Sequence, residues 1–268
     1  MNKYYILFCL YDGYRERISY CSEELNYYSA LHDEFKDQYE IKVNDNCMSP
    51  ILHKNKYIYA FCKHINDIYT IPFVDLFYIQ TNGHKDKLSI INNNNIDFDK
   101  KINKCVYRGN IINGTSQNFL NKHNHSLNQR EYFKSLLIAG KINNICYQND
   151  YMSIEDQIKY KYILDIDGWT NTWDGTVWKL YSGSVLLKTN SIWKQWYYDD
   201  LKPYVHYVPV NNDFSNLNEQ IKWCQINQDK CKQIIYNARN FVLENLNFEK
   251  VINDTINTVI EYFKEQQF

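Results

Sequence analysis

The stretch that decides the fold is residues 159–215, KYKYILDIDGWTNTWDGTVWKLYSGSVLLKTNSIWKQWYYDDLKPYVHYVPVNNDFS. It holds three short apolar runs with the length and β-branched content of buried strands: Tyr160–Ile166, Ser184–Leu187 and Tyr204–Val210. A glycine-bearing loop and a helix-like run separate the first two strands, and a second helix-like run precedes the third. Such alternation predicts a parallel α/β sheet.

Ligands of open parallel sheets bind beyond the carboxyl ends of the strands. We therefore expect two segments beside the ligand cleft, Asp165–Trp173 and the small-residue turn Ser182–Ser184. Upstream, a further short strand at Lys104–Tyr107 runs directly into Arg108 and Gly109.

Four blocks of this region resemble glycosyltransferase family 90. They are KYILDIDG (161–168), WKLYSGS (178–184), LKPYVHYVPV (201–210) and, upstream, VYRGN (106–110). The resemblance covers about residues 105–245. Several separate blocks in the family's order are more specific than a lone glycine motif.

The resemblance implies an α/β fold of the GT-B kind, in which two Rossmann-like domains face each other across a cleft. It divides the chain into a reduced acceptor-side domain (1–100), a nucleotide-sugar-binding domain (101–247) and a C-terminal helix (248–268) that crosses back to the first domain. Within the first 100 residues, periodicity predicts helices at 21–39 and 57–68 and strands at 4–11 and 73–79.

The implied activity is transfer of a sugar, glucose or xylose, from a UDP-sugar to a hydroxyl on a protein or glycan acceptor. Inversion at the anomeric carbon, without a metal or other cofactor, is implied with it. The alternative is a catalytically inactive relative that binds nucleotide sugars or carbohydrates.

The donor site is expected around a fixed cation and backbone amides, because a diphosphate needs both. Arg108 suits phosphate oxygens through its planar fork, and Gly109 permits close approach. The arginine that the family often has near Thr176 is missing, so Lys179 either supplies that charge or is a solvated helix residue. The other residues assigned to the nucleotide sugar are Asp167, Gly168, Trp173, Ser182, Gly183 and Ser184.

Asp165 and Asp167 lie two apart at a strand end and so share one side of the strand. Such a pair could be interpreted as a metal-binding Asp-x-Asp motif. Since the surrounding blocks resemble a metal-independent family, we interpret Asp167 as a partner for sugar or ribose hydroxyls and Asp165 as structural.

The acceptor base is the point where this chain departs from the family. The resemblance implies an aspartate just beyond a strand of the first domain, but Gly83 and His84 stand at the corresponding place. His84 is a candidate base because imidazole titrates near neutrality, and Asp86 is the second candidate.

Composition excludes several function classes. The net charge of −1 offers no basic field for nucleic acid or an anionic membrane, and a 44% hydrophobic chain can build a packed core. The eight cysteines form no Cys-x-x-Cys pair, which argues against zinc. No apolar run has membrane length and the start lacks a signal-peptide pattern, so a cytoplasmic protein is expected, in a host cell if the chain is viral. Nothing in the sequence indicates an oligomeric state.

Overall fold

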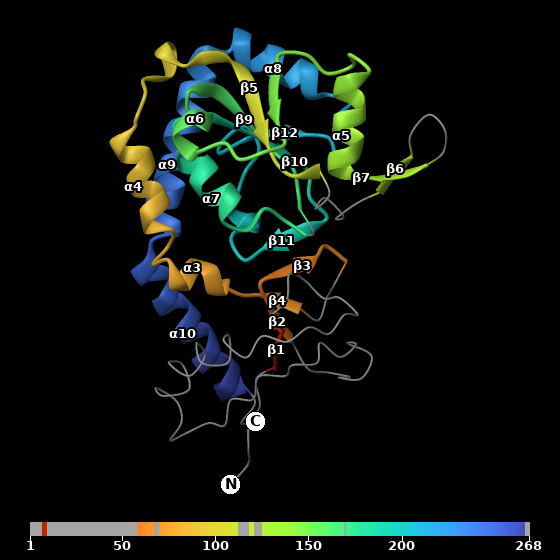
Figure 1. The fold of residues 1–268 in the computed structure, drawn as a ribbon. Helices are drawn as coiled ribbons and strands as arrows, with labels where there is room; N and C mark the ends of the chain where they lie inside the picture. The colour runs from red at the N-terminus through yellow and green to blue at the C-terminus, as the bar shows by residue number, and fades with distance from the viewer. Residues whose placement is uncertain are drawn as a thin grey trace.

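A five-stranded parallel sheet forms the centre of the computed structural model, which describes residues 7–9, 58–66, 70–111, 118–120, 125–168 and 170–265 (Figure 1). The strand order is β12-β10-β9-β5-β8, and all four neighbouring pairs are parallel. The strands are β5 (Ile102–Arg108), β8 (Ile145–Gln148), β9 (Tyr160–Asp165), β10 (Val185–Thr189) and β12 (Val208–Val210). The predicted parallel α/β fold is confirmed.

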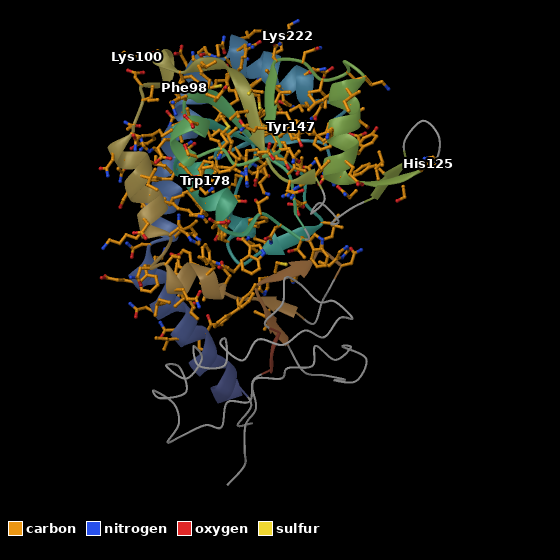
Figure 2. The ribbon with its side chains drawn as sticks, viewed as in Figure 1. Phe98, Lys100, His125, Tyr147, Trp178 and Lys222 are labelled. Carbon is orange, nitrogen blue, oxygen red and sulfur yellow. The ribbon has the colours of Figure 1, made fainter. Side chains whose placement is uncertain are left out.

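Helices cover both faces of this sheet. They are α4 (Lys85–Asn93), α5 (Gln129–Ile138), α6 (Ile154–Gln157), α7 (Trp173–Tyr181), α8 (Leu217–Ile226) and α9 (Gln228–Asn245), whereas the last helix, α10 (Phe248–Glu265), lies apart from the sheet. Side chains of α5 and α8 pack on one face, side chains of α4 and α7 pack on the other, and α9 contacts both. Figure 2 shows side chains filling the layers between helices and sheet.

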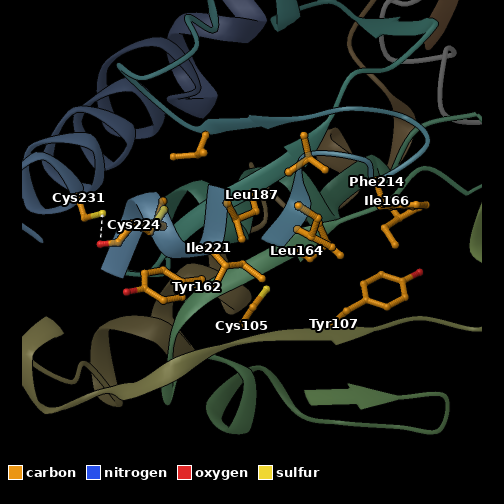
Figure 3. Packing of buried hydrophobic residues seen from close by; sticks show 14 of the residues in the cluster. Cys105, Tyr107, Tyr162, Leu164, Ile166, Leu187, Phe214, Ile221, Cys224 and Cys231 are labelled. Atoms are coloured by element: carbon orange, nitrogen blue, oxygen red, sulfur yellow. Dashed lines mark hydrogen bonds between the residues drawn. The ribbon is translucent and has the colours of Figure 1, made fainter. Parts of the chain in front are cut away.

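The strands bury alternate residues in opposite layers. Tyr162 and Leu164 of β9 belong to the core under α5 and α8, whereas Ile163 between them belongs to the core under α4 and α7. Figure 3 shows the first of these cores. Because both faces are covered, the two central strands β9 and β10 are largely apolar along their length, which is why the sequence located them closely.

The third predicted strand is shorter than expected. Only Val208–Val210 pairs in the sheet, because a turn occupies the residues before it. In that turn the backbone N–H of His206 donates to the carbonyl of Lys202 (2.9 Å), and Tyr204 adopts a φ of 59°. The helix expected between β10 and β12 is also absent from residues 190–207, which are all described and form β11 (Trp193–Gln195) and a short 3-10 helix, η4 (Tyr198–Asp200).

A second, three-stranded parallel sheet has the order β1-β2-β4, made by Leu7–Cys9, Ile58–Ala60 and Thr70–Pro72. Strand β3 (Cys62–His64) pairs antiparallel with β11 and so joins the chain's first part to the region of the larger sheet. Another antiparallel pair, β6 (Asn118–Leu120) with β7 (Ser126–Asn128), precedes α5.

Two predictions for the first hundred residues are wrong. Residues 57–68 contain β2 and β3 rather than a helix, and residues 73–79 contain the start of helix α3 (Leu76–Gln80) rather than a strand. In α3 the carboxylate of Asp75 accepts the backbone N–H of Tyr78 (2.7 Å), a helix cap that outweighs the apolar character of the run. The helix predicted over 21–39 lies outside the described residues.

The C-terminal helix starts against α3. The Tyr78 hydroxyl donates to the carbonyl of Leu246 (2.6 Å), and the rings of Tyr78 and Phe248 lie 6.2 Å apart. From there α10 runs past α3, away from the five-stranded sheet (Figure 1).

A buried ionic cluster stands at the carboxyl end of β9. The carboxylate of Asp165, fully buried, pairs with Lys179 of α7 and lies 3.7 Å from the ammonium of Lys188 of β10. The hydroxyls of Thr172 and Thr176 each donate to the same carboxylate at 2.8 Å. Burial alone would raise the pKa of Asp165, but the two ammonium groups and the hydrogen bonds outweigh it and hold that pKa well below its usual range.

We expect Asp165→Asn to lower the free energy of unfolding by about 3–5 kcal/mol, because it leaves buried ammonium groups without their counter-charge. Urea unfolding monitored by fluorescence gives this difference. The matched control is Asp199→Asn, whose pair with Lys194 is exposed and should contribute about 0–1 kcal/mol. Equal losses in the two variants would contradict a stabilising role for the buried cluster.

Candidate active site

A cavity of about 740 Å³ opens at the carboxyl edge of the five-stranded sheet. Its walls come from residues at or beyond the ends of β5, β8 and β9, together with the start of α7 and parts of α4 and α6. The volume lies within the range of small-molecule sites. The cavity is therefore where the strand order predicts a ligand.

Arg108, the last residue of β5, lines this cavity and is exposed. Its Nε donates to the carbonyl of Asp150 (3.1 Å), which steadies the side chain beside the end of β8. Gly109 is buried next to it, and a Cβ there would overlap the hydroxyl of Tyr107. A glycine is thus required at position 109 by packing within its own strand.

Arg130 is a wall residue that the sequence analysis did not select. It donates Nε to the carbonyl of Asp167 (2.8 Å), and its two terminal nitrogens donate to the carbonyls of Asn110 (3.1 Å) and Ile166 (3.0 Å). The guanidinium thereby links the loop that follows β5 to the loop that follows β9. Its position in the first turn of α5, after the Asn128 cap, gave no sign of this.

Lys179 also lines the cavity, but its charge is engaged. The residue is 7% exposed, and its ammonium pairs with Asp165. Burial lowers the pKa of Lys179, and the Asp165 carboxylate opposes that shift. The interpretation as a solvated helix residue is wrong, because α7 turns this side chain toward the sheet.

Asp167 and Gly168 follow β9 directly. Gly168 lines the cavity, while the Asp167 carboxylate is 2% exposed and accepts the hydroxyl of Ser191. Its other oxygen, Oδ1, has no hydrogen-bond partner among the described residues. Burial raises the pKa of Asp167 to about 6, although Lys188 and the Ser191 hydroxyl oppose that rise. Asp167 is therefore placed behind the cavity wall.

The carboxylates of Asp165 and Asp167 have different partners. Asp165 is fully engaged by two lysines and two threonines, and Asp167 turns to Ser191. No group of three or more His, Cys, Asp or Glu side chains within the described ranges is arranged to hold a metal ion.

Trp173 begins α7 and lines the cavity, with its ring 6.1 Å from that of Phe61. Its backbone N–H donates to the Asn171 side chain (3.2 Å). That side chain is itself buried, and its Nδ2 finds no acceptor in the described part of the chain. The start of α7 therefore presents both an aromatic wall and an available amide donor.

The turn Ser182–Ser184 lies at the opposite edge of the sheet, so its predicted place beside the cleft is wrong. A turn that precedes a parallel strand sits at the amino edge. There the Ser184 hydroxyl donates to the carbonyl of Tyr160 (2.7 Å), and the Lys101 ammonium donates to Ser184 Oγ (2.9 Å) and to the Ser182 carbonyl (3.1 Å). Gly183 has a φ of +69°, which favours glycine. These small residues close a buried turn.

Neither His84 nor Asp86 lies among the described residues that line the cavity. His84 caps α4 and is 2% exposed, with its ring against those of Phe77 and Tyr78 and its Nδ1 3.0 Å from the Thr81 hydroxyl. Burial lowers the pKa of His84 to about 4, and the nearby Lys87 ammonium adds to that shift. Asp86 is exposed in the first turn of α4.

The sequence analysis also missed polar wall residues outside the segments it had selected, among them Lys87, Tyr151 and Glu155. Lys87 comes from α4, and Tyr151 and Glu155 follow β8. The signal that could have found the last two is β8 itself, since every parallel strand contributes its carboxyl end to this edge. No such signal exists for Lys87, because the position of α4 beside the site depends on how that helix packs and not on a strand end.

We expect a buried neutral His84 to make stability depend on pH. Its folded pKa lies below the ordinary 6.5, so its contribution is present above that pH and is lost as pH falls toward 4. His84→Asn suits the left-handed backbone there (φ 59°) and removes the titration. The free energy of unfolding of the parent minus that of this variant should fall by about 1–2 kcal/mol between pH 7 and pH 5.

Urea unfolding at the two pH values measures that change. Taking the difference between two proteins cancels other titrations, including that of Asp75, whose pKa burial raises to about 6. A difference that stays the same at both pH values would mean that His84 can be protonated in the folded protein.

None of the helices in the described ranges has the length and apolar character to cross a bilayer.

Comparison with known proteins supplies the family. The model of glycosyl transferase family 90 matches residues 82–268. Uncharacterized protein 179R of Invertebrate iridescent virus 6 is 37% identical over 113 residues, which is 40% of this chain and 10% of that protein. Protein O-glucosyltransferase 2 of Danio rerio is 26% identical over 170 residues, which is 60% of this chain and 32% of that protein.

Among solved structures, Anabaena HepE in complex with UDP-glucose is 9% identical and aligns with 96% of this chain and 99% of that chain, at a TM-score of 0.42. A likeness at that score carries no conclusion. The chain spans about a tenth to a third of the curated relatives named above. The family match covers more than half of the chain and confirms the resemblance seen in the four sequence blocks. The chain belongs to glycosyl transferase family 90.

Proposed function

We propose that this protein transfers a sugar from a UDP-sugar to a hydroxyl group of a protein or glycan acceptor, with inversion and without a metal ion. The observation that carries the proposal is the cavity at the carboxyl edge of the sheet, in a chain of this family, with Arg108 in its wall. The name of the Danio rerio relative favours glucose as the sugar and a protein as the acceptor.

The two sheets suit the GT-B arrangement that we propose for the whole site. The five-stranded sheet would hold the donor, and the smaller sheet would contribute the acceptor side. Strand β3, which follows β2 of the smaller sheet, pairs with β11, which follows β10 of the larger sheet, and so links the two sheets through a separate two-stranded pair. This pairing supports a site formed between them.

The leaving group of such a transfer is a diphosphate, whose developing charge must be stabilised. Arg108 uses Nε for the Asp150 carbonyl, and its two terminal nitrogens, which have no partner among the described residues, suit bidentate contact with phosphate oxygens. Asn171, just before α7, also lines the cavity, and its buried side-chain amide has no acceptor among the described residues. Preorganised donors of this kind supply transition-state stabilisation without a metal.

For the acceptor base we propose Asp86 in preference to His84. Asp86 is exposed and is followed directly by Lys87, which lines the cavity. His84 is enclosed by aromatic rings, so an acceptor hydroxyl would have to displace Phe77 or Tyr78 to reach it. An exposed carboxylate can accept the hydroxyl proton as the oxygen attacks.

Arg108→Ala should weaken UDP binding about 10–100-fold, the value of one charge-assisted contact to a phosphate. Isothermal titration calorimetry measures this. Lys104→Ala is the matched control, since Lys104 is an exposed cation on the same strand outside the cavity wall. If both variants bind UDP within twofold of the parent, Arg108 does not contact the diphosphate.

Asp86→Asn should lower turnover about 10²–10⁴-fold while UDP affinity stays within twofold, because a general base acts on the acceptor and not on the donor. Turnover is measured as UDP release in the presence of acceptor, and His84→Asn should retain it. Loss of turnover in folded His84→Asn, with Asp86→Asn active, would assign the base to His84. UDP binding by the parent protein without turnover on any acceptor would favour the non-catalytic alternative, to which the departure at Gly83 and His84 points.

A further inference from the structure

The cations in the wall of the cavity differ in how much of their charge is available. Among the described residues the wall contains Lys87, Arg108, Arg130 and Lys179. Arg130 is used by three backbone carbonyls and Lys179 by the buried Asp165. Within the described residues the terminal nitrogens of Arg108 have no partner, whereas the Lys87 ammonium pairs with a partly exposed carboxylate and lies 5.4 Å from the centre of the Phe77 ring.

That carboxylate belongs to Asp174, in the first turn of α7. The side chains of Lys87 and Asp174 are 32% and 21% exposed, and both line the cavity. Solvent screens this pair only in part, so exchange requires an anion that replaces the carboxylate's charge beside Lys87.

Asp174 occupies a place that favours negative charge. The backbone N–H groups of Trp173 and Gly175 are taken by the Asn171 side chain (3.2 Å) and the Thr172 carbonyl (2.5 Å), but the helix dipole still stabilises a carboxylate in this first turn. Phosphate groups are stabilised at such helix starts for the same reason. Beside it the buried Asn171 amide still lacks an acceptor within the described residues, and it also lines the cavity.

We propose that Lys87 and Asp174 form an exchangeable ion pair, in which Asp174 holds Lys87 in the empty cavity and the diphosphate of the donor displaces Asp174 to bind Lys87. This inference rests on the proposed function. Lys87 thereby supplies, from α4, the charge that α7 lacks at Thr176. A diphosphate carries more negative charge and more acceptor oxygens than one carboxylate, which gives the exchange its direction.

The two partners have opposite effects on affinity, which makes the proposal testable. Lys87→Gln should weaken UDP binding at least tenfold, whereas Asp174→Asn should tighten it about three- to tenfold by removing the competing carboxylate. Uridine has no diphosphate, so its affinity should stay within twofold in both variants. In the double variant the gain from Asp174→Asn should disappear, because that gain acts through Lys87.

Calorimetry with UDP and with uridine, with and without Mg²⁺, measures these changes. Lys85→Gln is the matched control and should change neither affinity, because Lys85 is an exposed lysine two residues before Lys87 on α4 and lies outside the cavity wall. Melting temperatures near that of the parent confirm that the variants fold.

Three results overturn the inference. One is unchanged UDP affinity in both single variants while the parent binds UDP; the proposed function then stands. Another is weaker UDP binding by Asp174→Asn only when Mg²⁺ is present, which would make Asp174 a metal ligand. Failure of the parent protein to bind UDP at all would remove the proposed donor site itself, and the exchange with it.

Discussion

The pairing of one buried carboxylate with two lysines organises the carboxyl edge of the sheet. Asp165 ends the central strand β9, and its partners Lys179 and Lys188 come from the helix and the strand that follow. Burying a carboxylate alone would be strongly unfavourable, so the three charges must come together for the edge to form. The hydroxyls of Thr172 and Thr176 complete the carboxylate's hydrogen bonds and fix where α7 begins.

The same cluster determines which charges remain for a ligand. Lys179 neutralises Asp165, and Arg130 holds the loops after β5 and β9, so two of the cavity's cations maintain its shape. Arg108 and Lys87, at the rim, keep capacity for an anion. Counting the four cations of the cavity wall would overstate the positive charge available to an anionic ligand, because Lys179 and Arg130 are engaged by other groups of the protein.

Two wrong predictions in the first part of the chain show where sequence patterns do not determine secondary structure. Residues 57–68 have helical spacing of apolar side chains, yet short β2 and β3 form there because they pair with partners distant in sequence. Residues 73–79 have the apolar content of a strand, yet Asp75 caps a helix within them. Runs of three to five residues carry too little periodicity to outweigh a single long-range pair or a single cap.

The sequence by itself determined the parallel α/β sheet, the family, and Arg108 at a strand end, because buried strands of this kind are continuous apolar runs and the motif blocks are local. The tertiary structure alone decided which side chains meet. In the structure Ser182–Ser184 lies at the amino edge of the sheet. A turn that precedes a parallel strand lies at the opposite edge from a loop that follows the neighbouring strand. The tertiary structure also enclosed His84 among aromatic rings and brought Lys87 to α7. The contacts of Ser184 and Lys87 join residues far apart in the chain, and the enclosure of His84 depends on burial, which no local pattern encodes.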